Sequence, residues 1–145
     1  MAPSGDWAVS VGAGPRARLW DLRTDALRAE LVGHTLAVWA AAAVGPYLVT
    51  ADEQGGVLVW DPATGARLAA LPFEELSPGL AVRGDRLLTF GSGRPRIWQL
   101  RPDAPLRQRA LHDARVRGLA FDPARPILWS ASNDGTARGL ELTTG

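Results

Sequence analysis

The stretch that decides the fold runs from Ala17 to Thr35 and reads ARLWDLRTDALRAELVGHT. It holds a strand-like run that ends at Trp20, and His34 follows fourteen residues after that tryptophan. The tryptophan then recurs, because Trp60 lies forty residues further on and Trp98 lies thirty-eight residues after Trp60. The recurrence predicts a repeat architecture with a period of about forty residues.

A second column of residues supports the repeat. The position fourteen residues after each tryptophan holds His34, Glu74 and His112, so both histidines of the chain occupy one repeat position. Within each unit, short runs rich in Val, Leu and Trp alternate with Gly, Pro and Asp turns, which is typical of strands. The Asn133-Asp134-Gly135 segment is a hairpin signal. Each unit is therefore predicted to be four short antiparallel strands, the length of a propeller blade, rather than part of a helical solenoid.

The composition indicates an ordinary globular domain. Apolar residues make up 46% and charged residues 21% of the 145 residues, and the formal net charge is +1. No basic stripe suits a phosphate backbone, so a nucleic-acid partner is not expected. The absence of cysteine excludes disulfides and thiolate chemistry. The N-terminus lacks a signal-peptide pattern and no apolar run could span a bilayer. We expect a cytoplasmic protein with no membrane partner and no cofactor.

The units resemble the WD-repeat (WD40) β-propeller family. The motifs that carry the resemblance are Gly33-His34, the strand Leu48 to Ala51, and the run Val57 to Asp61 that ends in Trp-Asp. The segment LWSASNDGTARGLE, residues 128–141, is similar to the family pattern that normally ends in Trp-Asp. The resemblance implies an all-β fold, a partial β-propeller of about three and a half four-stranded antiparallel blades.

In this family a histidine, a strand Ser or Thr, a turn Asp and the strand-end Trp form a structural chain of hydrogen bonds. The resemblance implies that the second unit uses His34, Thr50 and Trp60, with Gln54 at the aspartate position. The third unit has Glu74 in place of the histidine, and Ser92 lies near its turn.

The fourth unit would use His112, Ser130 and Asp134 for the same chain of hydrogen bonds. Its tryptophan position holds Leu140, so the chain loses its last member there. We therefore expect no unit to keep all four members.

Counting strands gives three, four, four and three along the chain. This count predicts an incomplete first blade at 1–35, a second at 36–75, a third at 76–113 and an incomplete fourth at 114–145. Such an arc is open unless further sequence or a second chain completes it, and two chains would supply eight incomplete blades. On the two open sides we expect apolar residues that need cover: Trp7, Val9 and Leu19 on one, and Phe121, Ile127 and Trp129 on the other.

The candidate catalytic and metal-binding motifs are weak. His112-Asp113 could be a metal-ligand pair, but no second histidine lies near it in the sequence and the repeat already explains His112. Ser130 lacks the Gly-x-Ser-x-Gly elbow that exposes a nucleophile. The glycine-rich turns have no helix after them to hold a phosphate. No catalytic residue and no metal site are expected.

A partner-binding surface is the stronger prediction. Trp39 and Arg117 lie five residues after the repeat histidines, and Arg115 lies three residues after His112. In the family these places line the rim of the central channel, where partners dock. Tryptophan and arginine are also the side chains most often found at binding hot spots. The three residues are therefore predicted to bind another protein.

These observations predict a non-catalytic protein–protein interaction scaffold, a fragment of a longer propeller. The alternative from a different class is a sensor or regulatory portion of a larger signalling enzyme. The catalytic domain of that enzyme, a kinase or an NTPase, would lie outside this chain. Self-association that completes the ring is a further option for the partner.

Overall fold

A computed structural model describes residues 6–72, 76, 79–92, 94–102 and 107–141 of the 145-residue chain. These residues contain fourteen strands, which form four antiparallel sheets of three, four, four and three strands. Each sheet is a meander in which strands that follow one another in sequence lie side by side. Within the same residues, no helix is long and apolar enough to cross a membrane.

We call the four sheets blades 1 to 4. Blade 1 contains β1 (Trp7–Ser10), β2 (Arg16–Asp21) and β3 (Ala26–Val32). Blade 2 contains β4 (Val38–Val44), β5 (Tyr47–Asp52), β6 (Val57–Trp60) and β7 (Arg67–Leu71). Blade 3 contains β8 (Gly79–Arg83), β9 (Arg86–Phe90), β10 (Arg96–Gln99) and β11 (Arg107–Ala110). Blade 4 contains β12 (Val116–Phe121), β13 (Ile127–Ser132) and β14 (Ala137–Glu141).

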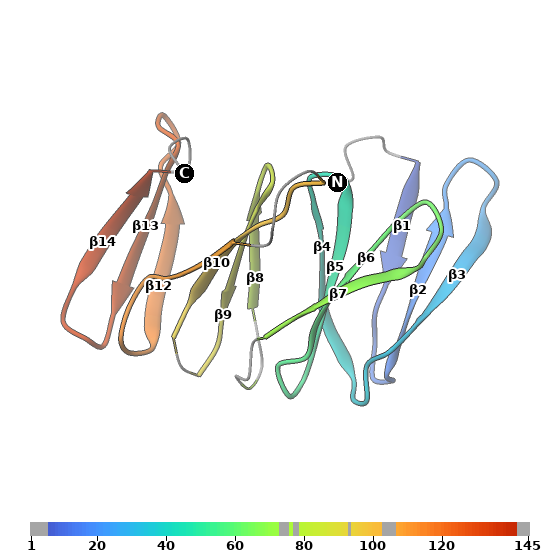
Figure 1. Cartoon of the computed structure of the whole chain (residues 1–145), viewed down its shortest axis with the longest axis horizontal. Helices are drawn as coiled ribbons and strands as arrows, with labels where there is room; N and C mark the ends of the chain where they lie inside the picture. Colours follow the sequence, from blue (N-terminus) through green and yellow to red (C-terminus); the bar gives the residue numbers. More distant parts are fainter. Residues whose placement is uncertain (1–5, 73–75, 77–78, 93, 103–106, 142–145) are drawn as a thin grey trace.

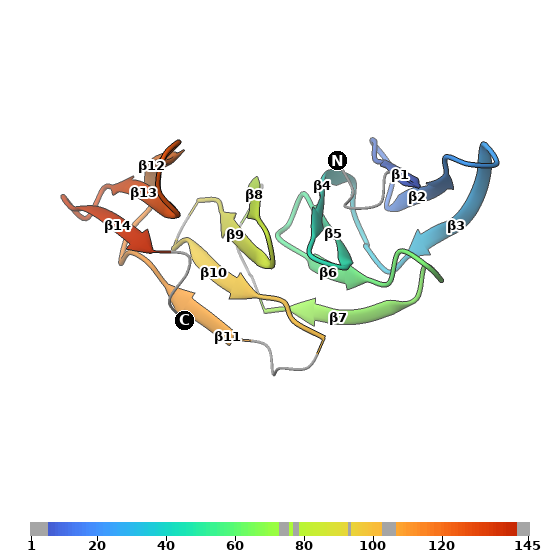
Figure 2. The same ribbon diagram turned by 90° about the horizontal axis from the view of Figure 1, so that it is seen from above.

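The blades stand side by side in an open arc (Figure 1). Seen from above, β4, β8 and β12 lie along the inner side of the arc, and β3, β7, β11 and β14 lie toward the outer side (Figure 2). Blade 1 and blade 4 occupy the two ends and do not meet. The expectation of an all-β, partial propeller is therefore confirmed.

The hydrophobic core lies between the blades. One cluster joins blades 1 and 2, a second joins blades 2 and 3, and a third joins blades 3 and 4. A blade with a neighbour on both faces buries every residue of a strand, as in β6, whose four residues are all buried. In β2 at the end of the arc, Ala17 and Leu19 are buried and Arg16 and Arg18 are exposed. This alternation follows the two-residue period of a strand that is covered on one face.

The burial pattern corrects the residues expected on the two open sides. Leu19 is fully buried, and Trp7 and Val9 pack against the cluster between blades 1 and 2. Phe121 belongs to the opposite end of the arc, yet its ring lies under the Arg83 guanidinium of blade 3, 5.8 Å from the ring centroid. These four residues therefore face neighbouring blades. The sequence assigned them to the wrong faces because it indicated the strands but not which side of each blade has a neighbour.

Candidate functional site

Blade 2 contains a buried chain of four hydrogen-bonded side chains. His34 lies before β4, Thr50 lies within β5, Asp52 ends β5, and Trp60 ends β6. The His34 ring is 2.8 Å from Asp52 Oδ2 through Nδ1 and 2.6 Å from Thr50 Oγ1 through Nε2. Trp60 Nε1 donates to the same Thr50 hydroxyl at 2.7 Å. The chain of bonds ties the segment before the inner strand to the middle of the blade.

This geometry corrects the expectation that Gln54 interrupts the network and that no unit keeps four members. Asp52, two residues before Gln54, supplies the carboxylate instead. Its other oxygen accepts the backbone N–H groups of Gln54 at 3.1 Å and Gly56 at 2.7 Å. A Cβ on Gly56 would overlap the Asp52 carboxylate. The missing side chain at position 56 therefore makes the room that Asp52 occupies.

Blade 4 builds the corresponding network from a different aspartate. The His112 ring is 2.9 Å from Asp134 Oδ2 and 2.7 Å from Ser130 Oγ. Thr136 Oγ1 donates to Asp134 Oδ1 at 2.7 Å and lies 3.2 Å from His112 Nδ1. The hydroxyl and the backbone amide of Thr136, together with His112, hold the pKa of the Asp134 carboxyl far below its ordinary value. Leu140 stands in the tryptophan position and donates no hydrogen bond.

Among the described residues, blades 1 and 3 keep the tryptophan link of this network and no histidine link. Trp20 Nε1 donates to Ser10 Oγ at 2.9 Å, and Trp98 Nε1 donates to Thr89 Oγ1 at 2.8 Å. Glu74 lies outside the described residues. Sequence reasoning missed Ser10 and Thr89, although a hydroxyl residue nine or ten positions before each tryptophan was a usable signal.

The two histidines serve as connectors in this geometry. Both ring nitrogens of His34, and both of His112, lie within hydrogen-bond distance of a side chain of their own blade. Neither ring presents a nitrogen lone pair to solvent, which a general base or a metal ligand would need. Among the described residues no group of three or more His, Cys, Asp or Glu side chains gathers as a metal site would require.

Two of the three residues expected to bind a partner, Trp39 and Arg117, lie at irregularities in inner strands. The β4–β5 register shifts between Val38 and Ala40, and the β12–β13 register shifts between Val116 and Gly118. The extra residue at each shift is Trp39 or Arg117. A β-bulge of this kind redirects a side chain away from the regular pleat. Trp39 is 66% exposed, so most of a large apolar side chain meets solvent.

The arginines of blade 4 are also exposed. Arg117 Nε donates to Asn133 Oδ1 at 2.9 Å, which orients the guanidinium next to the hairpin turn. The backbone carbonyl of Arg115 accepts hydrogen bonds from the backbone N–H of Asn133 at 2.9 Å and from the Ser132 hydroxyl at 3.1 Å. These bonds fix the backbone of Arg115 and leave its side chain exposed at the surface.

The structure does not bring Trp39 and the two arginines into one cluster. Trp39 and Arg117 are the second residues of β4 and β12, and Arg115 directly precedes β12. These two strands begin at the same edge of the arc, and blade 3 stands between them (Figure 1). The corresponding residue of blade 3 is Gly79, where the Phe90 ring occupies the space that a Cβ would need. Trp39 and Arg117 therefore lie on either side of a blade that has no side chain at the corresponding position.

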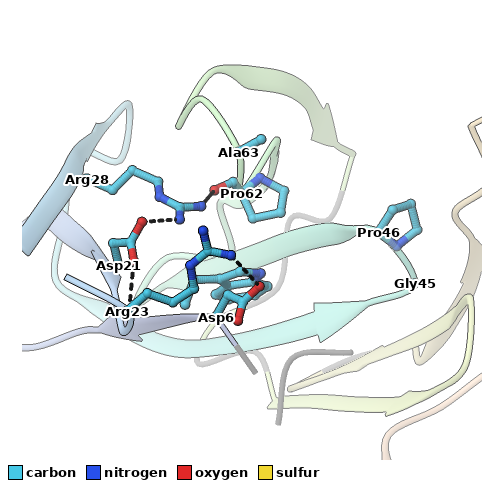
Figure 3. Close-up of a pocket in the computed structure, with 9 residues that line it drawn as sticks. Asp6, Asp21, Arg23, Arg28, Gly45, Pro46, Pro62 and Ala63 are labelled. Carbon is cyan, nitrogen blue, oxygen red and sulfur yellow. Dashed lines mark hydrogen bonds and ion pairs between the residues drawn. The ribbon is translucent and has the colours of Figure 1, made fainter. Parts of the chain in front are cut away.

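A pocket of about 510 Å³ opens at the opposite edge, between blades 1 and 2 (Figure 3). Its charged residues pair with one another. Arg28 donates to Asp21 Oδ2 at 2.6 Å and to the carbonyl of Pro62 at 2.9 Å, while Arg23 lies 3.8 Å from Asp6. The hydrogen bond from Arg28, with a backbone bond from Arg23, lowers the pKa of Asp21. The hydrogen bond from Arg28 to Pro62 joins blades 1 and 2 at this pocket. Because its arginines and aspartates already pair with one another, the described residues of the pocket offer no unpaired charge to a ligand.

Comparisons with known proteins agree with this architecture. A family model described as WD domain, G-beta repeat matches residues 26–61. The chain is 31% identical to the ribosome biogenesis protein YTM1 of Chaetomium thermophilum over 150 aligned positions, which cover 97% of this chain. The chain spans only 29% of the length of that relative.

Two solved structures match almost the whole arc. The crystal structures of the computationally designed Ika4 and Ika8 proteins each match with a TM-score of 0.72 and 26% identity, over 97% of this chain. The match covers 88% of the Ika4 chain and 44% of the Ika8 chain. The same arc thus fits nearly all of one solved chain and slightly less than half of another.

Proposed function

This chain belongs to the WD-repeat β-propeller family, and from that premise we propose that it is a non-catalytic scaffold that binds another protein. The binding surface is the edge of the arc that carries Trp39, Arg115 and Arg117. A relative named for ribosome biogenesis supports a role in macromolecular assembly. Fold alone would not assign a function, so the argument rests on the surface.

The observation that carries the proposal is the shared position of two exposed side chains. Trp39 and Arg117 are each the extra residue of a bulge at the start of an inner strand, and each follows a histidine of a buried network by five residues. The Arg117 guanidinium is already oriented by its hydrogen bond to Asn133, which reduces the entropy that this side chain loses on binding. A tryptophan that is 66% exposed also offers apolar area that a partner could cover.

The experiment compares partner binding by two matched double variants. Trp39→Ala/Arg117→Glu alters the proposed surface, and Leu22→Ala/Arg23→Glu makes the same kinds of change at the opposite edge. Proteins that cross-link to the wild-type chain are identified first. The amount of each of these proteins that cross-links to either double variant is then measured. We expect loss of the same partners from the first variant only. Equal capture by both variants would contradict the proposed surface.

Several finer predictions rest on the sequence and on the length of the relative. The chain spans 29% of YTM1, which is compatible with an arc that belongs to a longer propeller or is joined to a signalling enzyme. The cytoplasmic location and the lack of a nucleic-acid partner also stay predictions. Reading the coding sequence on both sides of the 145 codons tests the first point, because in-frame Trp-Asp repeats would identify a longer propeller.

A further inference from the structure

We propose that two copies of this chain associate head to tail, with blade 4 of each copy docked against blade 1 of the other. The inference starts from the two faces at the ends of the arc. We define the open face of blade 1 by Ala8, Ser10, Arg18 and Trp20, and the open face of blade 4 by Ile127, Trp129, Ala131 and Gly139. The proposal concerns self-association and does not depend on the partner-binding surface.

Strand alternation assigns these residues to the open faces. In β1, Trp7 and Val9 pack toward blade 2, so Ala8 and Ser10 point the other way. In β13, Leu128 and Ser130 are buried toward blade 3, so Trp129 points away from it. Trp129 is 47% exposed.

The three internal interfaces show what these positions normally do. On the face toward the preceding blade, the residue two before the strand hydroxyl is Leu48, Leu87 or Leu128, and each is buried. Each leucine shares a cluster with several apolar residues of the blade before it, and in every cluster one of these is the residue just before that blade's strand hydroxyl. The pairs are Val9 with Leu48, Val49 with Leu87, and Leu88 with Leu128. At each of the three internal interfaces, a Val or Leu of one blade and a Leu of the next therefore line the same apolar cluster.

The two open faces depart from this pattern in residue size, one with a smaller residue and the other with a larger one. Blade 1 has Ala8 where the other blades have leucine, and blade 4 has Trp129 where the others have Val or Leu. The summed side-chain volume of Trp and Ala lies between that of Val with Leu and that of Leu with Leu. Volume-conserving exchanges of this kind keep a core well packed. The large residue on one open face thus matches the small residue on the other.

The tryptophan on blade 4 is held in place before docking. Gly139 pairs with Trp129 across β13 and β14, and a Cβ on Gly139 would lie 2.8 Å from the indole ring. The ring therefore rests against bare backbone. An anchor that is already positioned loses little entropy when it binds.

An arginine column gives a second, independent sign that blade 1 accepts a docked blade. Arg96 of blade 3 donates to the carbonyl of Pro72, and Arg138 of blade 4 donates to the carbonyl of Leu111 at 2.9 Å. Both carbonyls follow the outer strand of the preceding blade. Arg18 holds the same position in blade 1 and is exposed, with Glu30 at 3.5 Å.

A docked blade 4 can supply an acceptor for Arg18. Among the described residues, β14 is the last strand of its sheet and has no strand beyond it. Its outer edge therefore carries backbone carbonyls that need a donor. Contacts of this head-to-tail type close into a ring when the rotation between copies fits. The Ika8 match covers 44% of that chain, so two copies of the arc would account for most of a chain of that length.

The test measures the mass of the 145-residue chain by sedimentation equilibrium at micromolar concentration. We expect twice the 15.4 kDa mass of one chain. Ala8→Leu should overfill the joint, and Trp129→Val should leave it underfilled, so each should raise the dimer dissociation constant about tenfold or more. Leu22→Val and Ala63→Leu, at exposed positions away from both end faces and from the partner-binding surface, are the controls and should leave that constant unchanged.

Mixing the two single variants gives the decisive result. In a mixed dimer one joint brings the two substituted positions together, so a leucine meets a valine in the sizes of an internal interface. The other joint keeps the native Ala8 and Trp129. We therefore expect an equimolar mixture to recover the dimer that each variant alone has lost.

Three results would each overturn the proposal. They are a monomeric or aggregated wild-type chain, a mass that grows without limit as the concentration rises, and a mixture that associates no better than its components. The monomeric result would instead favour further blades of the same polypeptide as the cover for both faces.

Discussion

Blades 2 and 4 place a histidine in nearly the same surroundings by different means. In blade 2 the carboxylate comes from Asp52, at the end of a strand, and position 56 is glycine. In blade 4 the carboxylate comes from Asp134, inside the turn, and the position that corresponds to Gly56 is Thr136. The two histidine–carboxylate distances are 2.8 and 2.9 Å. The comparison teaches that a carboxylate can reach the histidine ring from either of two sequence positions, provided that the residue at position 56 or 136 leaves room for it.

The largest expected effect is loss of the blade 2 carboxylate. Asp52→Ala leaves the fully buried ring of His34 and the backbone amides of Gln54 and Gly56 without their acceptor. We expect the free energy of unfolding to fall by about 3 kcal/mol, the scale of several buried donors left unsatisfied. Denaturant titration at one protein concentration measures it. Glu53→Ala, an exposed neighbour, is the control, and an equal loss in both variants would refute the role of Asp52.

A smaller loss is expected from filling the space in blade 2. Gly56→Thr places a side chain where the Asp52 carboxylate lies. It should lower the free energy of unfolding by about 2 kcal/mol. The triple variant Asp52→Ser/Gln54→Asp/Gly56→Thr copies the residues of blade 4 and should regain most of that stability. If the triple variant is no more stable than the single one, the two arrangements are not interchangeable.

In blade 4 the carboxylate should matter less than in blade 2. Asp134→Ala leaves Thr136 Oγ1 at 3.2 Å from His112 Nδ1, so the hydroxyl can accept the hydrogen bond that the carboxylate loses. We expect a measurable drop in melting temperature that is smaller than the drop for Asp52→Ala. Adding Thr136→Ala to Asp134→Ala should then enlarge the loss. A drop as large as that of Asp52→Ala would contradict the substitute role of Thr136.

The smallest effect is a dependence on pH that blade 4 contributes. The pKa of Asp134 is lowered in the folded chain by Thr136 and His112, while an unfolded aspartate has a pKa of about 4. Its stabilisation is therefore complete above about pH 4 and is lost as pH falls toward the lower folded value. Thermal melts of wild type and Asp134→Asn should differ at about pH 6 and converge in stronger acid. A difference that grows in acid would reverse the sign and reject the assignment.

The sequence was sufficient to predict the repeated blades, but not to predict where one blade takes its carboxylate from a different position than another. The spacing of Trp20, Trp60 and Trp98 predicted the blades because each tryptophan donates to a hydroxyl residue of the adjacent strand. Asp52 was missed because a fixed alignment put Gln54 at the aspartate position. Only the backbone path through the turn shows that a carboxylate two residues earlier reaches the same ring.

The faces of the end blades were harder still to predict. Alternation along a strand separates Leu19 from Arg18, but it does not say which of the two sides has a neighbour. That information lies in the direction in which the blades follow one another around the arc. The partner-binding role of Trp39, Arg115 and Arg117 stays a prediction, since exposure describes a surface and not its occupant.

The glycine at position 56 has a consequence for how such a chain can change over generations. A blade can pass from one arrangement to the other by single tolerated substitutions only if these occur in a particular order. Threonine gained at position 56 first would displace Asp52, and Asp52 lost first would leave His34 without its carboxylate. The route that avoids both steps gains the turn aspartate at position 54 beforehand, so that two carboxylates serve one histidine for a time. Repeats within one gene could in this way drift apart in sequence while each stage remains folded.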